Sequence, residues 1–234
     1  MTQLRGLFVT GTDTGVGKTA VAVALLRCAL RRGLRPIPLK PAETGCTPDA
    51  EDARRLWQAA QPPIDERDVC PYRFRLPAAP AQAAAVEGKA IALDDVVRHA
   101  EAVASRGDWL LVEGAGGLLV PYGDDGWTAA DLIERLGLAA VVVARTSLGT
   151  INHSALTVRE LQRRGLPIAA LVLNRTAPDQ QPQEVGSYPY VASGTGLTPL
   201  GPLPWLPSVQ DPDQLADALE AAIGPQRVAA LLAR

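Results

Sequence analysis

The stretch GTDTGVGKT, residues 11–19, follows an apolar run at positions 4–10 and precedes a segment with helical periodicity. Glycines allow such a loop to close around phosphate with its backbone N–H groups pointing inward, Lys18 reaches the outer phosphates, and the Thr19 hydroxyl can bind Mg²⁺. A standard phosphate loop has its first glycine at position 12, whereas this chain has threonine there and glycine one residue earlier. The stretch therefore predicts an enlarged nucleotide-phosphate loop between a strand and a helix.

Apolar runs and helical patterns alternate along the whole chain of 234 residues. Short, nearly continuous apolar strands separated by amphipathic helices indicate crossover connections and a parallel sheet covered on both faces. We therefore expect one α/β domain over residues 1–234, with a doubly wound, mostly parallel sheet that is P-loop NTPase-like. The expected strands cover 4–10, 36–40, 109–113, 139–144, 168–174 and 199–203, and the expected helices 18–32, 50–60, 79–87, 93–105, 128–136, 152–164 and 213–222. Residues 177–198 lack a clear helical period and predict a surface loop.

Composition excludes several classes of protein. The formal net charge is −2, and acidic and basic residues are mixed, so no basic stripe indicates a nucleic-acid partner. The cysteines Cys28, Cys46 and Cys70 lack the spacing of a zinc site or a disulfide framework. No apolar run approaches the roughly 20 residues of a membrane span, and no signal peptide precedes the first strand. We expect a soluble, cytoplasmic protein that contacts neither membrane nor nucleic acid.

Polar side chains follow the expected strands where a doubly wound sheet binds its ligands, beyond the carboxyl ends. Lys40 follows the second strand and would place positive charge where a phosphoryl group is transferred. Glu113 ends the third strand and can hold Mg²⁺ together with Thr19. A second carboxylate can come from the acidic start of the helix at 50–60, and the residues alone leave Asp49, Glu51 and Asp52 as equal candidates.

Two further segments suggest ligand contacts. SLGTINHSALT, residues 147–157, places a Gly-Thr turn ahead of a helix whose first N–H groups can bind an anion such as a carboxylate. His153 in that segment has no nearby nucleophile or second histidine in sequence, which favours a structural role. GPLPWLP, residues 201–207, fits either a rigid loop or a wall for an adenine ring.

Taken in order, the motifs resemble those of dethiobiotin synthetases of the biotin pathway. The motifs are GTDTGVGKT, KPAETG at 40–45, VEGAGG at 112–117, SLGTINH at 147–153, an asparagine at 174 and PWL at 204–206. The resemblance implies a ligase that uses ATP, Mg²⁺ and CO₂ to close 7,8-diaminopelargonic acid into dethiobiotin, with release of ADP and phosphate. It also implies two intermediates, an N-carbamate and a carbamic-phosphoric anhydride. The reaction would be the penultimate step of biotin synthesis.

The resemblance also implies roles for individual residues. Lys18, Lys40 and Thr14 would be catalytic, and Lys40 and Thr44 would contact the diamine. Among the acidic candidates it selects Asp52, which would bind Mg²⁺ together with Thr19 and Glu113. The backbone at Gly149, Thr150 and Asn152 would hold the substrate carboxylate from the partner subunit of a homodimer. The expected ATP-binding residues are Gly15, Val16, Gly17, Lys18, Thr19, Ala20, Asp52, Glu113, Gly114, Ala115, Gly116, Asn174, Arg175, Pro204, Trp205 and Leu206.

Two questions stay open at this level. Arg175 follows Asn174 where members of the family often carry an acid, so the base pocket could accept other nucleoside triphosphates. The main alternative is a septum-positioning or plasmid-partition ATPase, which shares the fold and switches partners with ATP. Those proteins carry a signature lysine at the start of the loop, where this chain has Asp13.

Overall fold

The computed structural model describes residues 4–179, 182–206 and 211–234. A six-stranded sheet forms its centre, with every strand pairing parallel to its neighbour. The parallel strands bring all their carboxyl ends to one edge, where the ligands of such sheets bind. The strands are β1 (Gly6–Gly11), β2 (Pro36–Leu39), β5 (Trp109–Gly117), β6 (Ala139–Arg145), β7 (Ile168–Asn174) and β8 (Leu200–Leu203), in the spatial order β2-β5-β1-β6-β7-β8.

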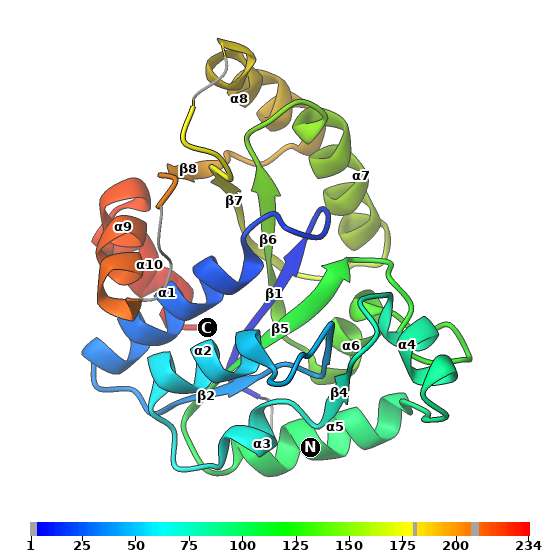
Figure 1. Cartoon of the computed structure of the whole chain (residues 1–234). Helices are drawn as coiled ribbons and strands as arrows, with labels where there is room; N and C mark the ends of the chain where they lie inside the picture. The colour runs from blue at the N-terminus through cyan, green and yellow to red at the C-terminus, as the bar shows by residue number, and fades with distance from the viewer. Residues whose placement is uncertain (1–3, 180–181, 207–210) are drawn as a thin grey trace.

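Helices cover both faces of this sheet (Figure 1). Alternate residues of a strand face opposite sides, so Leu7 and Val9 of β1 pack in one core while Phe8 packs in the other. The first core is covered by α1 (Lys18–Arg31), α2 (Glu51–Ala60), α9 (Pro212–Ile223) and α10 (Pro225–Leu232), and the second by α5 (Leu93–Ala104), α6 (Ala129–Leu136) and α7 (Thr150–Arg163). The predicted doubly wound α/β fold is confirmed.

Every predicted strand and helix has a counterpart, with bounds that differ by at most four residues. Sequence analysis missed four short or peripheral elements: β3 (Ala42–Thr44), β4 (Tyr72–Phe74), α3 (Glu66–Val69) and α10. The strands β3 and β4 pair with each other as a separate two-stranded sheet beside α4 (Pro80–Val86). The elements β3, β4 and α3 have only three or four residues and are too short to show a period in sequence.

The prediction of a loop over 177–198 is wrong, because most of that segment forms α8 (Pro182–Thr195). Pro189 lies inside the helix, and its missing N–H weakens the local helical preference. Tertiary contacts stabilise the helix instead. Val191 is fully buried in the second core, the Thr146 hydroxyl donates a hydrogen bond of 2.7 Å to Glu184, and α8 packs along α7. Residues 180 and 181 of the predicted loop lie outside the described residues.

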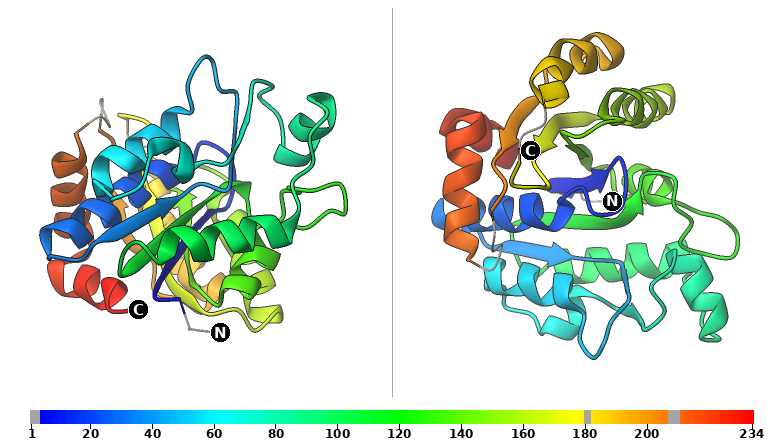
Figure 2. Two further views of the ribbon diagram at one scale, coloured as in Figure 1. Left: turned by 90° about the horizontal axis from the view of Figure 1, so that it is seen from below. Right: turned by 45° about the horizontal axis from the view of Figure 1, so that its top comes forward.

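The chain after β8 returns to the first face and forms α9, which packs along α1. The two helices lie side by side in Figure 1 and in both views of Figure 2, α1 in blue and α9 in orange-red. In the part of the chain that the structure describes, no helix has the length and apolar character needed to cross a membrane.

Candidate active site

The phosphate loop joins β1 to α1 at the carboxyl edge of the sheet. Gly15 and Gly17 have φ angles of 71° and 96°, a region that favours glycine. The Thr12 N–H donates to the carbonyl of Val143 on β6, at 3.0 Å. The side-chain amide of Asn174 donates to the Val16 carbonyl, also at 3.0 Å. The loop is therefore held by β6 and β7, two strands on the same side of β1 that follow the loop in sequence by more than a hundred residues.

Lys18 and Thr19 start helix α1, and both side chains face the same space above the sheet. The Lys18 ammonium donates to the Asp13 carbonyl at 2.9 Å, so it closes the loop on itself. Burial lowers the pKa of Lys18 to about 8, against the opposing effect of Glu113. The Thr19 hydroxyl donates to Glu113 Oε1 at 2.8 Å.

Lys40 lies at the centre of a buried charged cluster with Glu113 and Asp52. Its ammonium donates to Glu113 Oε1 at 2.7 Å and to Asp52 Oδ2 at 2.8 Å. Burial favours the neutral amine, but the two carboxylates outweigh it and raise the pKa of Lys40 above its usual range. Lys40 is therefore charged at neutral pH. The pKa of Asp52 lies below its usual range because Lys40 overcomes the effect of burial.

Glu43 orients this cluster from the neighbouring β3. Its two carboxylate oxygens accept the backbone N–H groups of Asp52 and Ala53, at 3.0 and 2.9 Å. These are free donors of the first turn of α2, whose N-cap residue Ala50 makes no side-chain capping bond. Glu43 thus caps α2 from outside the helix and holds Asp52 beside Lys40. Sequence reasoning missed this role, although Glu43 lies within the quoted KPAETG motif.

One cavity of about 500 Å³ brings most of the predicted site residues together. Thr14 and Thr44 contribute polar groups to its wall, and Trp205 contributes an aromatic ring. Six lining residues were not among the predicted site residues: Glu43, Arg55, Thr176, Leu203, Leu215 and Ala218. The last two come from α9, and only the folded chain brings that helix to the loop. The predicted residues that line the cavity are Thr14, Gly15, Gly17, Lys18, Thr19, Ala20, Lys40, Thr44, Asp52, Glu113, Ala115, Gly116, Asn174, Arg175, Pro204, Trp205 and Leu206.

The other predicted residues lie outside this lining. Val16 is buried beneath the loop, and Gly114 lies against the Phe8 ring, which would be 3.1 Å from an added Cβ. Gly149, Thr150 and Asn152 form the start of α7 at a separate place on the surface. The Asn152 side chain is exposed there, while Thr150 is buried. Within its own chain, the start of α7 does not reach the cavity.

Comparisons with known proteins identify relatives of this chain. A family model described as an AAA domain matches residues 5–213. The ATP-dependent dethiobiotin synthetase of Anaeromyxobacter dehalogenans is 50% identical to this chain over 207 residues, which cover 88% of the chain and 92% of that protein. The chain belongs to the dethiobiotin synthetase family. The dethiobiotin synthetase of Bacillus subtilis strain 168 is 34% identical to this chain over 209 residues. The matched region covers 88% of this chain and 90% of that protein.

Dethiobiotin synthetase membership is consistent with the fold, and it does not favour the alternative of a partition or septum ATPase. Among solved structures, the signal recognition particle receptor FtsY from Elizabethkingia anophelis has a TM-score of 0.49 and 15% identity. The match covers 99% of this chain and 66% of that one.

Proposed function

We propose that this protein is an ATP-dependent cyclo-ligase that converts 7,8-diaminopelargonic acid and CO₂ into dethiobiotin, ADP and phosphate. The observation that carries the proposal is the convergence of Lys18 and Lys40 on one cavity beside the phosphate loop. The relatives named above are ATP-dependent dethiobiotin synthetases over nearly their whole length. The three cysteines of the chain are free and buried, which supports a cytoplasmic enzyme with no disulfide framework.

The donor set at the cavity fits Mg²⁺. Glu113 Oε2 is buried and has no hydrogen-bond partner among residues 4–179, 182–206 and 211–234. No group of three or more histidine, cysteine or acidic side chains forms a complete cage within those residues. Magnesium on a nucleotide needs only one or two carboxylates plus phosphate oxygens and water. We propose Thr19, Asp52 and Glu113 as its protein ligands, and the bound ion would neutralise charge on the phosphates.

The proposed chemistry requires positioning and positive charge rather than a nucleophilic side chain. One amine of the diamine adds to CO₂ and loses a proton, which gives a carbamate. A carbamate oxygen then attacks the γ-phosphorus of ATP, and ADP leaves. Finally the second amine attacks the carbamoyl carbon, phosphate leaves, and loss of a proton completes the cyclic urea. Lys18 and Lys40 would stabilise the charge that develops on the phosphoryl oxygens, while Thr14 and Thr44 would orient the diamine.

The nucleotide would extend from the phosphate loop toward the segment after β8. Backbone N–H groups of the loop from Gly15 to Ala20 would hold the phosphates, and the 114–116 backbone would approach them from β5. Pro204, Trp205 and Leu206 would contact the base, with Asn174 and Arg175 at its edge. Asn174 lies next to Leu203 in the register of β7 and β8, which places it at that end of the cavity.

A second subunit would complete the diamine site. A further cavity of about 410 Å³ runs from Thr12–Thr14 along the apolar residues 118–121 to Leu156 of α7. Two large apolar side chains of its lining are exposed, Leu119 at 53% and Leu156 at 62%. Exposed apolar patches of this kind mark protein interfaces. We propose that α7 of a partner subunit covers this face and that its 149–152 backbone binds the substrate carboxylate.

The test of the proposed function is product formation. Purified protein is incubated with diaminopelargonic acid, bicarbonate, Mg²⁺ and ATP, and dethiobiotin is measured by mass spectrometry. We expect one ADP for each dethiobiotin and no turnover after chelation of Mg²⁺. ATP hydrolysis that does not respond to the diamine would favour a switch ATPase and overturn the proposal.

A further inference from the structure

Helix α9 lies along α1 on the first face of the sheet, and each helix contributes to the nucleotide cavity. Helix α1 carries Lys18 and Thr19 at its start, beside the phosphates. Helix α9 contributes Leu215 and Ala218 to the lining of the same cavity, which Trp205 also lines. The placement of α9 relative to α1 therefore sets the distance between the phosphate loop and the proposed base pocket.

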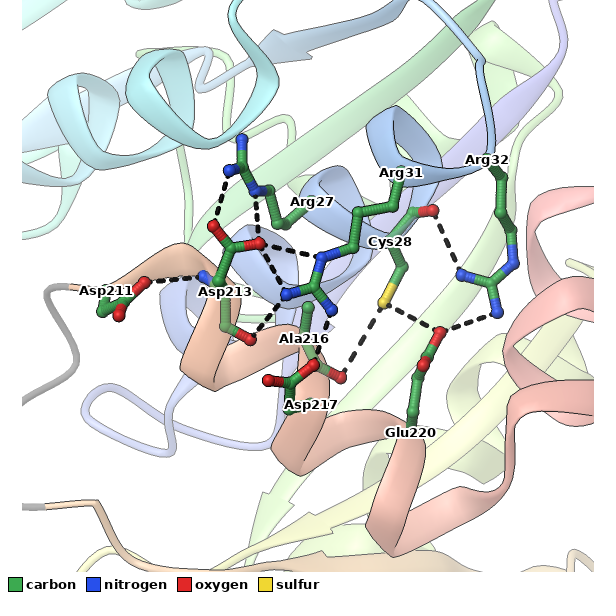
Figure 3. Close-up of polar contacts among 9 residues, drawn as sticks. All are labelled: Arg27, Cys28, Arg31, Arg32, Asp211, Asp213, Ala216, Asp217 and Glu220. Atoms are coloured by element: carbon green, nitrogen blue, oxygen red, sulfur yellow. Dashed lines mark hydrogen bonds and ion pairs between the residues drawn. The ribbon is translucent and has the colours of Figure 1, made fainter.

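A network of ion pairs joins the start of α9 to the C-terminal end of α1 (Figure 3). Arg27 binds Asp213 with two hydrogen bonds, of 2.9 Å from Nε and 2.5 Å from Nη2. Arg31 donates from Nε to the same carboxylate at 2.8 Å and from Nη2 to the Asp213 carbonyl at 3.2 Å. It also reaches Asp217, one turn further along α9, at 2.6 Å. A single carboxylate is thus shared by two guanidinium groups, with the paired geometry that arginine favours.

A second group of contacts lies further along the same pair of helices (Figure 3). Arg32 pairs with Glu220 at 2.7 Å and also donates to the Cys28 carbonyl at 3.2 Å. The buried Cys28 thiol lies between the helices, with Sγ 3.9 Å from the Ala216 carbonyl oxygen. The small side chains at positions 28 and 216 allow the two helices to approach closely. These polar contacts therefore extend from Asp213 to Glu220 along α9 and are gathered at the C-terminal end of α1.

The network is concentrated at Asp213, which binds both Arg27 and Arg31 and lies two residues before Leu215 of the cavity wall. The Arg27 and Arg31 side chains hold the pKa of Asp213 well below its usual range, so the carboxylate stays charged. The group is 42% exposed, and a single pair at such a surface adds little to global stability. Its main effect is geometric, because Asp213 lies in the first turn of α9, where its backbone N–H donates to the side chain of the N-cap residue Asp211.

We propose that Asp213 is a positioning residue for the nucleotide. Through Arg27 and Arg31 it fixes the α9 wall of the base pocket relative to the phosphate loop. The inference rests on the proposed function, because it assumes that the cavity holds a nucleoside triphosphate. It extends that function to residues that do not themselves line the cavity.

The test compares two ligands that differ only in whether they reach the base pocket. ATP contacts the loop and the base pocket, whereas inorganic tripolyphosphate contacts the loop alone. Calorimetry with Mg²⁺ gives the Kd of each ligand for the wild-type protein and for Asp213→Asn. We expect the Kd for ATP to rise about three- to tenfold in the variant, while the Kd for tripolyphosphate stays unchanged.

A matched control removes an ion pair of the same kind between two helices on the opposite face of the sheet. Arg135 of α6 pairs with Asp94 of α5 at 2.7 Å, and Asp94→Asn should leave both Kd values unchanged. An Arg27→Gln/Asp213→Asn double variant should bind ATP no more weakly than the weaker of its two single variants, because both changes break the same contact. Additive losses would contradict the coupling of these residues.

The results separate the inference from the proposed function. If the wild-type protein binds tripolyphosphate and ATP equally, the base pocket is not used, and the proposed nucleotide site fails. If the wild type prefers ATP and Asp213→Asn keeps that preference, only the positioning role is overturned. Equal weakening of both ligands would show general damage and would also overturn it. A melting temperature recorded for each variant confirms that the protein compared is folded.

Discussion

Lys40 illustrates how the folded chain prepares a single side chain. Its ammonium has three donors, of which two bind Glu113 and Asp52, so the third remains for a substrate oxygen. Lys40→Met keeps the length of the side chain and removes its charge. We expect kcat to fall at least about 100-fold, because preorganised charge at a reacting group is worth several kcal/mol. Dethiobiotin formation at saturating ATP measures the loss.

Lys89 provides the control for that substitution. It is a lysine at the surface, close to the Phe74 ring and outside the cavity. Lys89→Met should leave kcat unchanged. Near-normal turnover in Lys40→Met, with circular dichroism like that of the wild type, would remove Lys40 from the proposed catalytic residues.

Gly17 occupies a position that only glycine fits. Its φ is +96°, and an added Cβ would lie 2.1 Å from the Asn174 side-chain nitrogen. Gly17→Ala should therefore displace the loop or Asn174 and weaken ATP binding at least about tenfold. Gly33→Ala is the matched control, because Gly33 also has positive φ, at +78°, but its added Cβ would meet nothing within 4 Å. Equal ATP affinity in the two variants, measured by calorimetry, would contradict the expected clash.

Of the three acidic residues at positions 49–52, the structure directs one toward Lys40. Sequence left Asp49, Glu51 and Asp52 equal, and only the family resemblance selected among them. In the structure Asp52 reaches Lys40, while Asp49 pairs with Arg54 and Glu51 pairs with Arg55. Successive residues of a helix point about 100° apart, so only one of adjacent acids faces the cavity. Because α2 begins at Glu51, it is the Asp52 side chain that points toward Lys40.

At the scale of elements, α2 depends on a carboxylate from outside the helix. Glu43 accepts two N–H groups of its first turn, so Glu43→Gln removes the charge and leaves one of the two bonds. We expect the free energy of unfolding to fall by about 1–2 kcal/mol. We also expect kcat to fall, because Asp52 loses its fixed orientation. Urea denaturation and a turnover assay measure the two effects separately.

Glu87 offers a matched substitution for this experiment. Glu87 Oε1 accepts the backbone N–H groups of Arg75 and Leu76, at 2.6 and 3.2 Å, away from the cavity. Glu87→Gln thus neutralises another carboxylate that accepts two backbone N–H groups, without touching α2. It should leave kcat unchanged. A similar loss of kcat in both variants would show that Glu43 acts on stability alone.

The strands and helices that were predicted correctly are those whose burial in the folded protein leaves a regular pattern of apolar residues in the sequence. The strands β1, β6 and β7 are apolar because both their faces are buried, and the major helices of the two layers are amphipathic because one face is. Helix α8 was missed since Pro189 and two glycines hide its period, and packing against α7 stabilises it. Leu215 and Ala218 carried no signal of a ligand wall, because an apolar residue of an amphipathic helix is equally typical of the core.

At the scale of the whole molecule, two buried thiols couple stability to pH. Burial raises the pKa of Cys28 and of Cys70 to about 12, from an ordinary value of 9.0. Above pH 9 the unfolded chain loses these protons while the folded chain keeps them, so their contribution to stability falls as pH rises. The expected loss is about 1 kcal/mol for each thiol per pH unit above about 9.

Substitution isolates this effect from the other titrating groups. The free energy of unfolding of the wild type is compared with that of a Cys28→Ala/Cys70→Ala variant between pH 7 and pH 10. The variant lacks the thiols, so the stability advantage of the wild type should shrink as pH rises above 9. A difference that does not depend on pH would show that the thiols titrate normally in the folded protein.

The proposed dimer divides each diamine site between two chains, so two variants that are inactive alone should complement each other. Lys40→Met would inactivate the cavity but leave α7 intact. Gly149→Ala would disturb the turn before α7, where φ is +95° and an added Cβ would lie 3.2 Å from the His153 ring. Each variant alone should form inactive dimers. An equal mixture that exchanges subunits should contain half mixed dimers, each with one intact site, and so recover about a quarter of the wild-type activity. Mixed dimers observed by native mass spectrometry without recovered activity would show that each chain completes its own site.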